Sequence, residues 1–292
     1  MFGRLLLSFL FALGIGGCAD SEARLTGSHP ALWEIRSTEG DIAGWLFGTI
    51  HALPQDTVWR FDALDQAIDT SGMLLVEVAN LNDSDAVAAI FRQKAYDRPP
   101  DAAVAQRIDP AMRADYIRFA RTVGTDESEL DRMESWAAAL TLASLSRSGE
   151  PAAGVDRQLI ADYCDRPIGE LEGAERQFAT FDALPEREQR DLLDAVLAEA
   201  IDKGGPQNTI LAAWLKGDVG RLDVLTREGM LADPELRQIL LIDRNRDWAV
   251  RIVRAMQESR KPLVAVGAGH MLGEDGLPAL LAAHGYEVRR VR

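Results

Sequence analysis

Thiols and imidazoles are scarce in this chain of 292 residues, which holds two cysteines and four histidines. If Cys18 is modified, Cys164 has no partner, so no disulfide can form within the chain. Packing must therefore hold the fold. With 47% of its residues hydrophobic, the chain can bury one large core, or a core plus a helical subdomain.

Basic residues are also few, at 32 against 46 acidic ones, for a formal net charge of −14. No stretch rich in Lys and Arg with interleaved aromatic residues occurs. Such an anionic protein is repelled by phosphate backbones, which excludes nucleic acid as the expected partner.

Long hydrophobic runs are absent except at the start, where Leu5 to Gly17 carries no charge and follows a basic residue. This run is typical of a secretory signal and is too short to span a bilayer. It ends in Gly17-Cys18, which resembles a bacterial lipobox. We expect a signal peptide at 1–17, a lipidated tether at 18–30, and an exported, periplasm-facing protein anchored by Cys18. Ala19 favours the outer membrane. The alternative is an ordinary signal peptide in which Cys18 is incidental.

Short apolar runs bounded by turn residues lie near both ends of the remaining chain, while the middle shows helical spacing. We expect an α/β domain over 31–292, with a mixed sheet built from both ends and a helical insertion at about 83–259. The sheet is expected to return only at Leu263. Strands are expected at 32–36, 42–47, 73–78, 263–267 and 286–291, and helices at 60–69, 112–123, 129–146, 186–201, 233–256 and 277–284.

Two of the four histidines follow expected strands in the same way. Gly48-Thr49-Ile50-His51 and Gly267-Ala268-Gly269-His270 each place an imidazole just past an apolar strand. Strand ends that open into a crevice are where open α/β sheets bind ligands, so the two can converge. The alternative for either one is a hydrogen-bonded loop histidine.

Glu77 is the third candidate, because every neighbour in Met73 to Val78 is apolar. A carboxylate buried there needs a cation, a metal or strong donors. The alternative is that Glu77 points into water. Two histidines and a carboxylate can hold a divalent metal, and without one a His–Glu pair can activate water.

Charge also gathers at 243–247, within an otherwise apolar-striped helix. Spacing alone favours a solvated face with local ion pairs for Arg244 and its neighbours. Asp156, Arg157 and Glu172 are unremarkable by pattern alone. No phosphate-binding glycine loop or serine-centred elbow offers a rival chemistry.

Taken in order, these segments resemble the TraB/PrgY/GumN family. The fold it implies is shared with the TIKI proteases, the erythromycin esterases and the ChaN-like proteins. The resemblance covers roughly 31–291 and rests on Leu32-Trp33, Leu46 to His51, Leu75 to Val78, Asp243 to Ala249, Val264 to Gly273, Gly276-Leu277 and Gly285-Tyr286, with weaker motifs at Gly154 to Asp156, Leu171-Glu172 with Gln177, and Ala213 to Asp218.

The resemblance to TIKI members implies a metal-dependent peptidase that uses manganese or cobalt. In that interpretation His51, Glu77 and His270 hold the metal or its water, and Arg244 steadies the oxyanion. Two features depart from the family pattern. The second motif carries an extra glycine, Gly269, and Ala79 stands where family members often have a second acid.

Three functions follow as hypotheses. The leading one is a membrane-tethered peptidase or amidase that depends on Mn, Co or Zn. The second is a metal-free, esterase-like hydrolase with a histidine base. The third is a regulatory or binding lipoprotein without catalysis, in line with the pheromone-shutdown role of some family members. The enzyme hypotheses imply a peptide or a small ester or amide as substrate.

Overall fold

The computed structural model describes residues 29–146, 149–201 and 206–291. The predicted signal peptide, Cys18 and the tether up to residue 28 lie outside these described residues. None of the helices in the described part of the chain is long and apolar enough to cross a membrane.

A mixed sheet organises the domain, as expected from the sequence, and it has six strands. Its order is β4-β3-β5-β2-β1-β6. Strands β4, β3, β5 and β2 run parallel, and β1 is antiparallel to both β2 and β6. The strands span Leu32–Arg36 (β1), Ile42–Thr49 (β2), Met73–Val76 (β3), Ile168–Glu170 (β4), Pro262–Gly267 (β5) and Glu287–Arg290 (β6).

One edge of this sheet collects the carboxyl ends of all four parallel strands. Thr49 of β2 pairs with Gly267 of β5, and Val76 of β3 pairs with Ala265 of β5 and Glu170 of β4. The loops that follow β2, β3, β4 and β5 therefore leave the sheet side by side. They carry the candidate residues of the sequence analysis.

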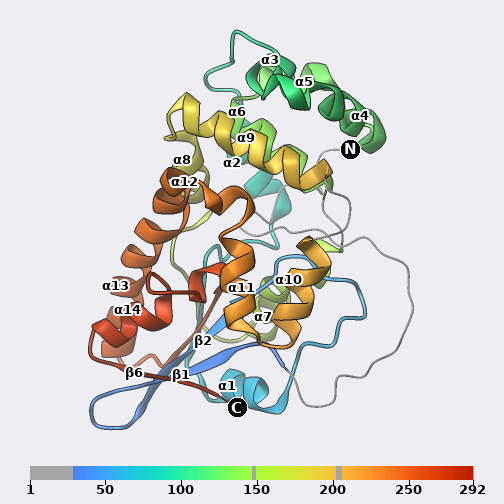
Figure 1. Ribbon diagram of the computed structural model, residues 1–292. Helices are drawn as coiled ribbons and strands as arrows, with labels where there is room; N and C mark the ends of the chain where they lie inside the picture. The colour runs from blue at the N-terminus through green and yellow to red at the C-terminus, as the bar shows by residue number, and fades with distance from the viewer. Residues whose placement is uncertain (1–28, 147–148, 202–205, 292) are drawn as a thin grey trace.

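The two faces of the sheet are covered by different helices (Figure 1). One face packs against α1 (Asp62–Thr70), α7 (Val155–Asp162), α10 (Pro206–Leu215) and α11 (Val219–Thr226). The other packs against α13 (Asp243–Gln257) and α14 (Leu277–Ala283). Both faces are thus buried, which explains the nearly continuous apolar runs of β3 and β5.

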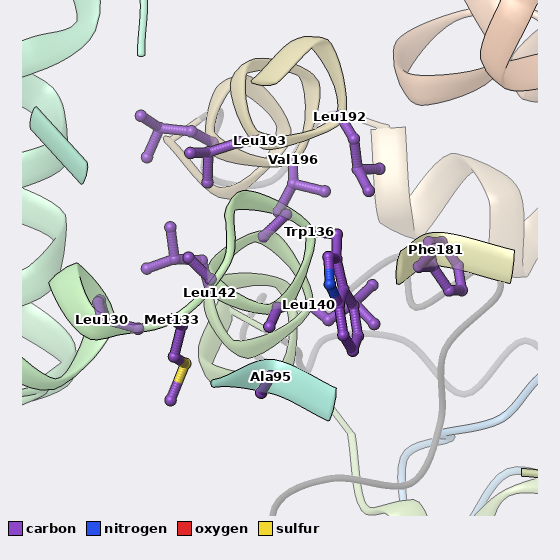
Figure 2. Packing of buried hydrophobic residues seen from close by; sticks show 14 of the residues in the cluster. Ala95, Leu130, Met133, Trp136, Leu140, Leu142, Phe181, Leu192, Leu193 and Val196 are labelled. Carbon is purple, nitrogen blue, oxygen red and sulfur yellow. The ribbon is translucent and has the colours of Figure 1, made fainter. Parts of the chain in front are cut away.

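The remaining helices form a separate block with its own core, at the top of Figure 1. Trp136 lies fully buried within it, and Figure 2 shows α9 side chains such as Leu193 and Val196 packed over α6. The helices of the block are α2 (Ser84–Ala95), α3 (Val104–Arg107), α4 (Arg113–Val123), α5 (Glu127–Arg132), α6 (Ser135–Ser146), α8 (Ala174–Asp182), α9 (Glu186–Ile201) and α12 (Pro234–Arg237).

Two expectations about this middle region are wrong. The sheet has a strand before Leu263, because β4 lies inside the predicted helical insertion. The helix expected at 129–146 is broken between α5 and α6. The helix expected at 233–256 is present as the consecutive segments α12, the π-helical turn Gln238–Ile242 and α13. Its predicted start is confirmed, since the Asp233 side chain accepts a hydrogen bond from the Leu236 amide.

Candidate functional site

His51 lies in the loop after β2, and its imidazole is paired with a carboxylate from α7. Nδ1 of His51 lies 2.6 Å from Oδ2 of Asp156, and both side chains are buried. The other oxygen, Oδ1, accepts a hydrogen bond of 2.7 Å from the Thr49 hydroxyl. Burial by itself raises the pKa of Asp156, but the charge and hydrogen bond of His51 and the Thr49 hydroxyl lower it below its ordinary value. Asp156 is therefore ionised at neutral pH, and Nδ1 of His51 carries the proton that it donates.

The backbone around this pair is held by close contacts. The Val155 amide donates to the Ile50 carbonyl at 2.9 Å, and the indole of Trp214 donates to the Gly48 carbonyl at 2.8 Å. A side chain at Gly154 would place its Cβ 2.1 Å from the His51 carbonyl oxygen. Only glycine allows α7 to begin this close to the loop, and α7 then presents Asp156 to His51.

Glu77 comes directly after β3, rather than inside a strand as expected, and it is buried. The alternative of a side chain in water is wrong, since Glu77 is only 5% exposed. Its Oε1 accepts from the Gly267 amide at 2.8 Å, and its Oε2 accepts from Gln177 and Arg244, each at 3.2 Å. Burial raises the pKa of Glu77, and the charges of Arg244 and His51 and the Gly267 amide oppose that effect.

Arg244 on α13 connects the acidic residues to the second histidine. Its guanidinium donates to Oε2 of Glu172 at 2.6 Å and to Oε2 of Glu77 at 3.2 Å. Nη1 donates to the Leu240 carbonyl at 2.9 Å and approaches Nε2 of His270 at 3.3 Å. The solvated face favoured by spacing is therefore wrong for Arg244, which is 7% exposed.

His270 is fully buried on the short turn after β5 (Ala268–Met271), and its tautomer follows from its neighbours. The Asn245 amide nitrogen donates to the Asp275 carbonyl at 2.7 Å, which turns its Oδ1 toward Nδ1 of His270 at 2.5 Å. Nδ1 therefore carries the proton, and Nε2 accepts from Arg244. Burial lowers the pKa of His270 well below 6.5, and the charges of Arg244 and His51 add to that effect. His270 is neutral at neutral pH.

The structure thus brings His51, Glu77, Arg244 and His270 into one buried cluster. His51 is close enough for its charge to influence the pKa of both Glu77 and His270. The roles assigned to these four residues remain predictions. The other two histidines lie elsewhere: His29 stacks on Phe61, and His284 is the C-cap residue of α14.

Four partners of the cluster were not singled out as site residues in the sequence analysis, because each acts across a long stretch of chain. Asp156 lies 105 residues from His51, and Glu172 lies 72 residues from Arg244. Asn245 and Gln177 complete the set. Asp156, Glu172 and Gln177 could have been found from the sequence only through their places in the weaker motifs of the family resemblance.

The arrangement does not fit a metal on His51, Glu77 and His270. Both oxygens of Glu77 and Nε2 of His270 face hydrogen-bond donors, and Arg244 stands between the two side chains. Within the described ranges, no group of three or more His, Cys, Asp or Glu side chains is arranged to hold a metal ion. The predicted Mn, Co or Zn ion stays a prediction, and its binding requires Arg244 to move.

Fold and site together define an α/β protein with a buried histidine, carboxylate and arginine cluster at the carboxyl edge of its sheet. The chain belongs to the TraB/PrgY/gumN family, whose model matches residues 31–290. It is 28% identical over 265 residues to the uncharacterized protein YbaP of Shigella flexneri, and likewise to YbaP of Escherichia coli strain K12. Each match covers 89% of this chain and 96% of the relative. No solved structure matches the chain.

Proposed function

We propose that this protein hydrolyses carboxylic esters or amides with His51 as the general base. The observation that carries the proposal is the 2.6 Å hydrogen bond between His51 Nδ1 and Asp156 Oδ2 in a buried setting. An ionised Asp156 fixes the tautomer in which Nε2 of His51 can take a proton. It also stabilises the imidazolium that forms when this happens.

In this reaction His51 removes a proton from water as the water oxygen attacks the carbonyl carbon of the substrate. The carbonyl oxygen gains negative charge, and the protonated His51 then returns its proton to the leaving alkoxide or amine. Arg244 is the cation of the cluster. All five N–H groups of its guanidinium already donate, to Glu77, Glu172, the Leu240 carbonyl and His270, so Arg244 would stabilise the oxyanion through its positive charge and not through an unused hydrogen-bond donor.

His270 and Asn245 act in this account as positioning residues. The neutral imidazole accepts from Arg244 through Nε2, and its other nitrogen is held by Asn245. A charged His270 would repel the guanidinium, so the low pKa of His270 keeps Arg244 in place.

The second candidate is the metal-dependent peptidase that the family resemblance implies. One observation favours it: His270 is neutral with its lone pair on Nε2, which is the form that binds metals. In that case His51, Glu77 and His270 would hold the ion, which these side chains do not fit while Arg244 donates to Glu77 and His270. The ion would act as a Lewis acid and would lower the pKa of a water molecule that it binds.

We further propose that the protein is exported, anchored through a lipidated Cys18 in the outer membrane, and faces the periplasm. The proposal rests on the apolar run before Cys18 and on Ala19 after it. The site would then act on peptides, esters or amides that reach the periplasm.

The test is hydrolysis of chromogenic acyl esters and acyl anilides of graded chain length by the purified protein and by His51→Ala. Release of alcohol or amine that disappears in the variant supports the proposal, provided that the variant keeps its circular dichroism spectrum. Equal release by both proteins would remove His51 from the chemistry. No release from any substrate by either would leave the regulatory or binding role as the better account.

A further inference from the structure

Arg157 lies next to the catalytic pair and is not used by the mechanism above. It is the third residue of α7 and directly follows Asp156. Its Nη1 donates to Oδ1 of Asn82 at 3.2 Å, and Asn82 lies in the loop that begins at Glu77. The guanidinium therefore bridges two segments that both supply residues to the site.

This partly buried arginine has few partners for its charge. Among the described residues, its guanidinium makes that one hydrogen bond and no salt bridge, and its buried Nε has no hydrogen-bond partner. Arg107 and Arg290 also have a buried Nε without a hydrogen-bond partner, but Arg107 donates to the carbonyls of Leu130 and Met133, and Arg290 lies over the ring of Trp33.

Its position is also unfavourable for the fold. The first turn of a helix carries a partial positive charge, which stabilises acids and destabilises cations. Burial lowers the pKa of Arg157, and Asp156 is the charge that opposes this effect. Both oxygens of Asp156 are already engaged by His51 and Thr49. A partly buried cation with open donors beside a reaction centre is a binding group for an anion.

We propose that Arg157 binds a carboxylate of the substrate, so that the enzyme acts on acyl compounds with a free carboxylate near the scissile bond, as at the C-terminal end of a peptide. This inference rests on the proposed hydrolytic function. A carboxylate fits the flat fork of the guanidinium. A phosphate dianion fits less well, because the carboxylates of Glu77, Glu172 and Asp156 gather in the same site and the Arg244 guanidinium is already paired with Glu77 and Glu172.

The test compares N-acetyl-trialanine as its free acid and as its C-terminal amide, with wild-type protein, Arg157→Gln and Arg92→Gln. Arg92 is exposed on α2 and provides the same change of charge away from the site. We expect the wild type and Arg92→Gln to prefer the acid in kcat/KM by about 10- to 100-fold. In Arg157→Gln the ratio of kcat/KM for the acid to kcat/KM for the amide should fall toward one, mainly because KM for the acid rises.

A structural role for Arg157 would give a different result. Because the cation lies at a helix N-terminus, Arg157→Gln should melt at the wild-type temperature or above it. The inference is overturned if Arg157→Gln melts at a lower temperature than the wild type and its kcat/KM falls equally for the acid and the amide. It is also overturned if the variant still prefers the acid. The same holds if the wild type shows no preference for the acid.

If neither peptide is hydrolysed, the proposed function fails and the inference is judged by binding. Calorimetry with the free acid and the amide on wild-type and Arg157→Gln proteins then decides. If the wild type binds the acid more tightly than the amide and Arg157→Gln does not, the result supports an anion site at Arg157. Binding without that difference, or no binding of the acid, overturns it.

Discussion

Among single residues, Asp156 matters most for the proposed hydrolysis, because it is the hydrogen-bond partner of His51. Asp156→Asn keeps the shape of the side chain but removes the charge that fixes the His51 tautomer. We expect kcat for ester or amide hydrolysis to fall by about 10²- to 10⁴-fold while the fold is retained. Steady-state kinetics with circular dichroism measure this. Asp165→Asn, the same change at an exposed position three residues after α7, is the control. A variant Asp156→Asn with the wild-type rate would show that the pair is structural.

Arg244 contributes both to the stability of the fold and to the proposed chemistry. Arg244→Met leaves Glu77 and Glu172 buried without their cation, which should lower the free energy of unfolding by about 3–5 kcal/mol. Arg244→Lys keeps the charge but loses the fork geometry, so its loss should be smaller. Urea denaturation of the two variants measures both values. Equal stability of Arg244→Met and wild type would contradict the contacts described for Arg244.

Sequence alone could identify His51 and His270 because each follows a short apolar strand, and Glu77 because it is a carboxylate among apolar residues. It could not assign their partners. The hydrogen bond from His51 to Asp156 and the one from His270 to Asn245 join residues 105 and 25 positions apart, and these depend on how α7 and α13 pack on the sheet. Spacing within the 243–247 segment favoured solvent for Arg244, because local pattern does not report that its helix packs against the sheet.

At the scale of elements, the helical block contains a titratable contact between α9 and the turn Gly229–Ala232. Glu199 of α9 accepts a hydrogen bond of 3.1 Å from the Met230 amide. Burial raises the pKa of Glu199 above its usual 4.5, and the Met230 amide opposes this effect. The contribution of Glu199 to stability is therefore full below pH 4.5 and is lost as the pH rises through the pKa of the folded state.

Glu199→Gln should remove this loss of stability at higher pH, because the glutamine side-chain oxygen can still accept the hydrogen bond from the Met230 amide and does not become charged. We expect the variant to have a higher free energy of unfolding than wild type at pH 7 and the same value near pH 4. Denaturant titrations at both pH values measure this. Glu228→Gln, an exposed glutamate beside the same turn, is the control. A variant Glu199→Gln less stable than wild type at pH 7 would show that the carboxylate is needed in its charged form.

Elements were predictable where hydrophobic spacing was strong. The helix expected at 186–201 is found as α9 with the same bounds, and all five expected strands are present. Strand β4 was missed because it has three residues, none of them buried, and pairs on one side only. The π-helical turn Gln238–Ile242 has no spacing of its own that a periodic pattern could reveal.

At the scale of the whole molecule, the anchor is a prediction from the sequence alone. Cys18→Ala should leave the protein exported but move it from the membrane fraction to the soluble exported fraction. Palmitate labelling in the bacterial host, followed by fractionation, measures this. Labelling that persists in Cys18→Ala, or an unlabelled wild type, would contradict lipidation at Cys18 and favour an ordinary signal peptide.

The most direct test of the account is hydrolysis by protein stripped of metal with a strong chelator, with metal content measured on the same sample. If His51 and Asp156 activate water as proposed, the stripped protein keeps its rate, added Mn(II), Co(II) or Zn(II) leaves it unchanged, and His51→Ala and Asp156→Asn abolish it. Activity that vanishes on stripping and returns with about one bound ion per chain would contradict the proposal, and it would favour a metal on His51, Glu77 and His270.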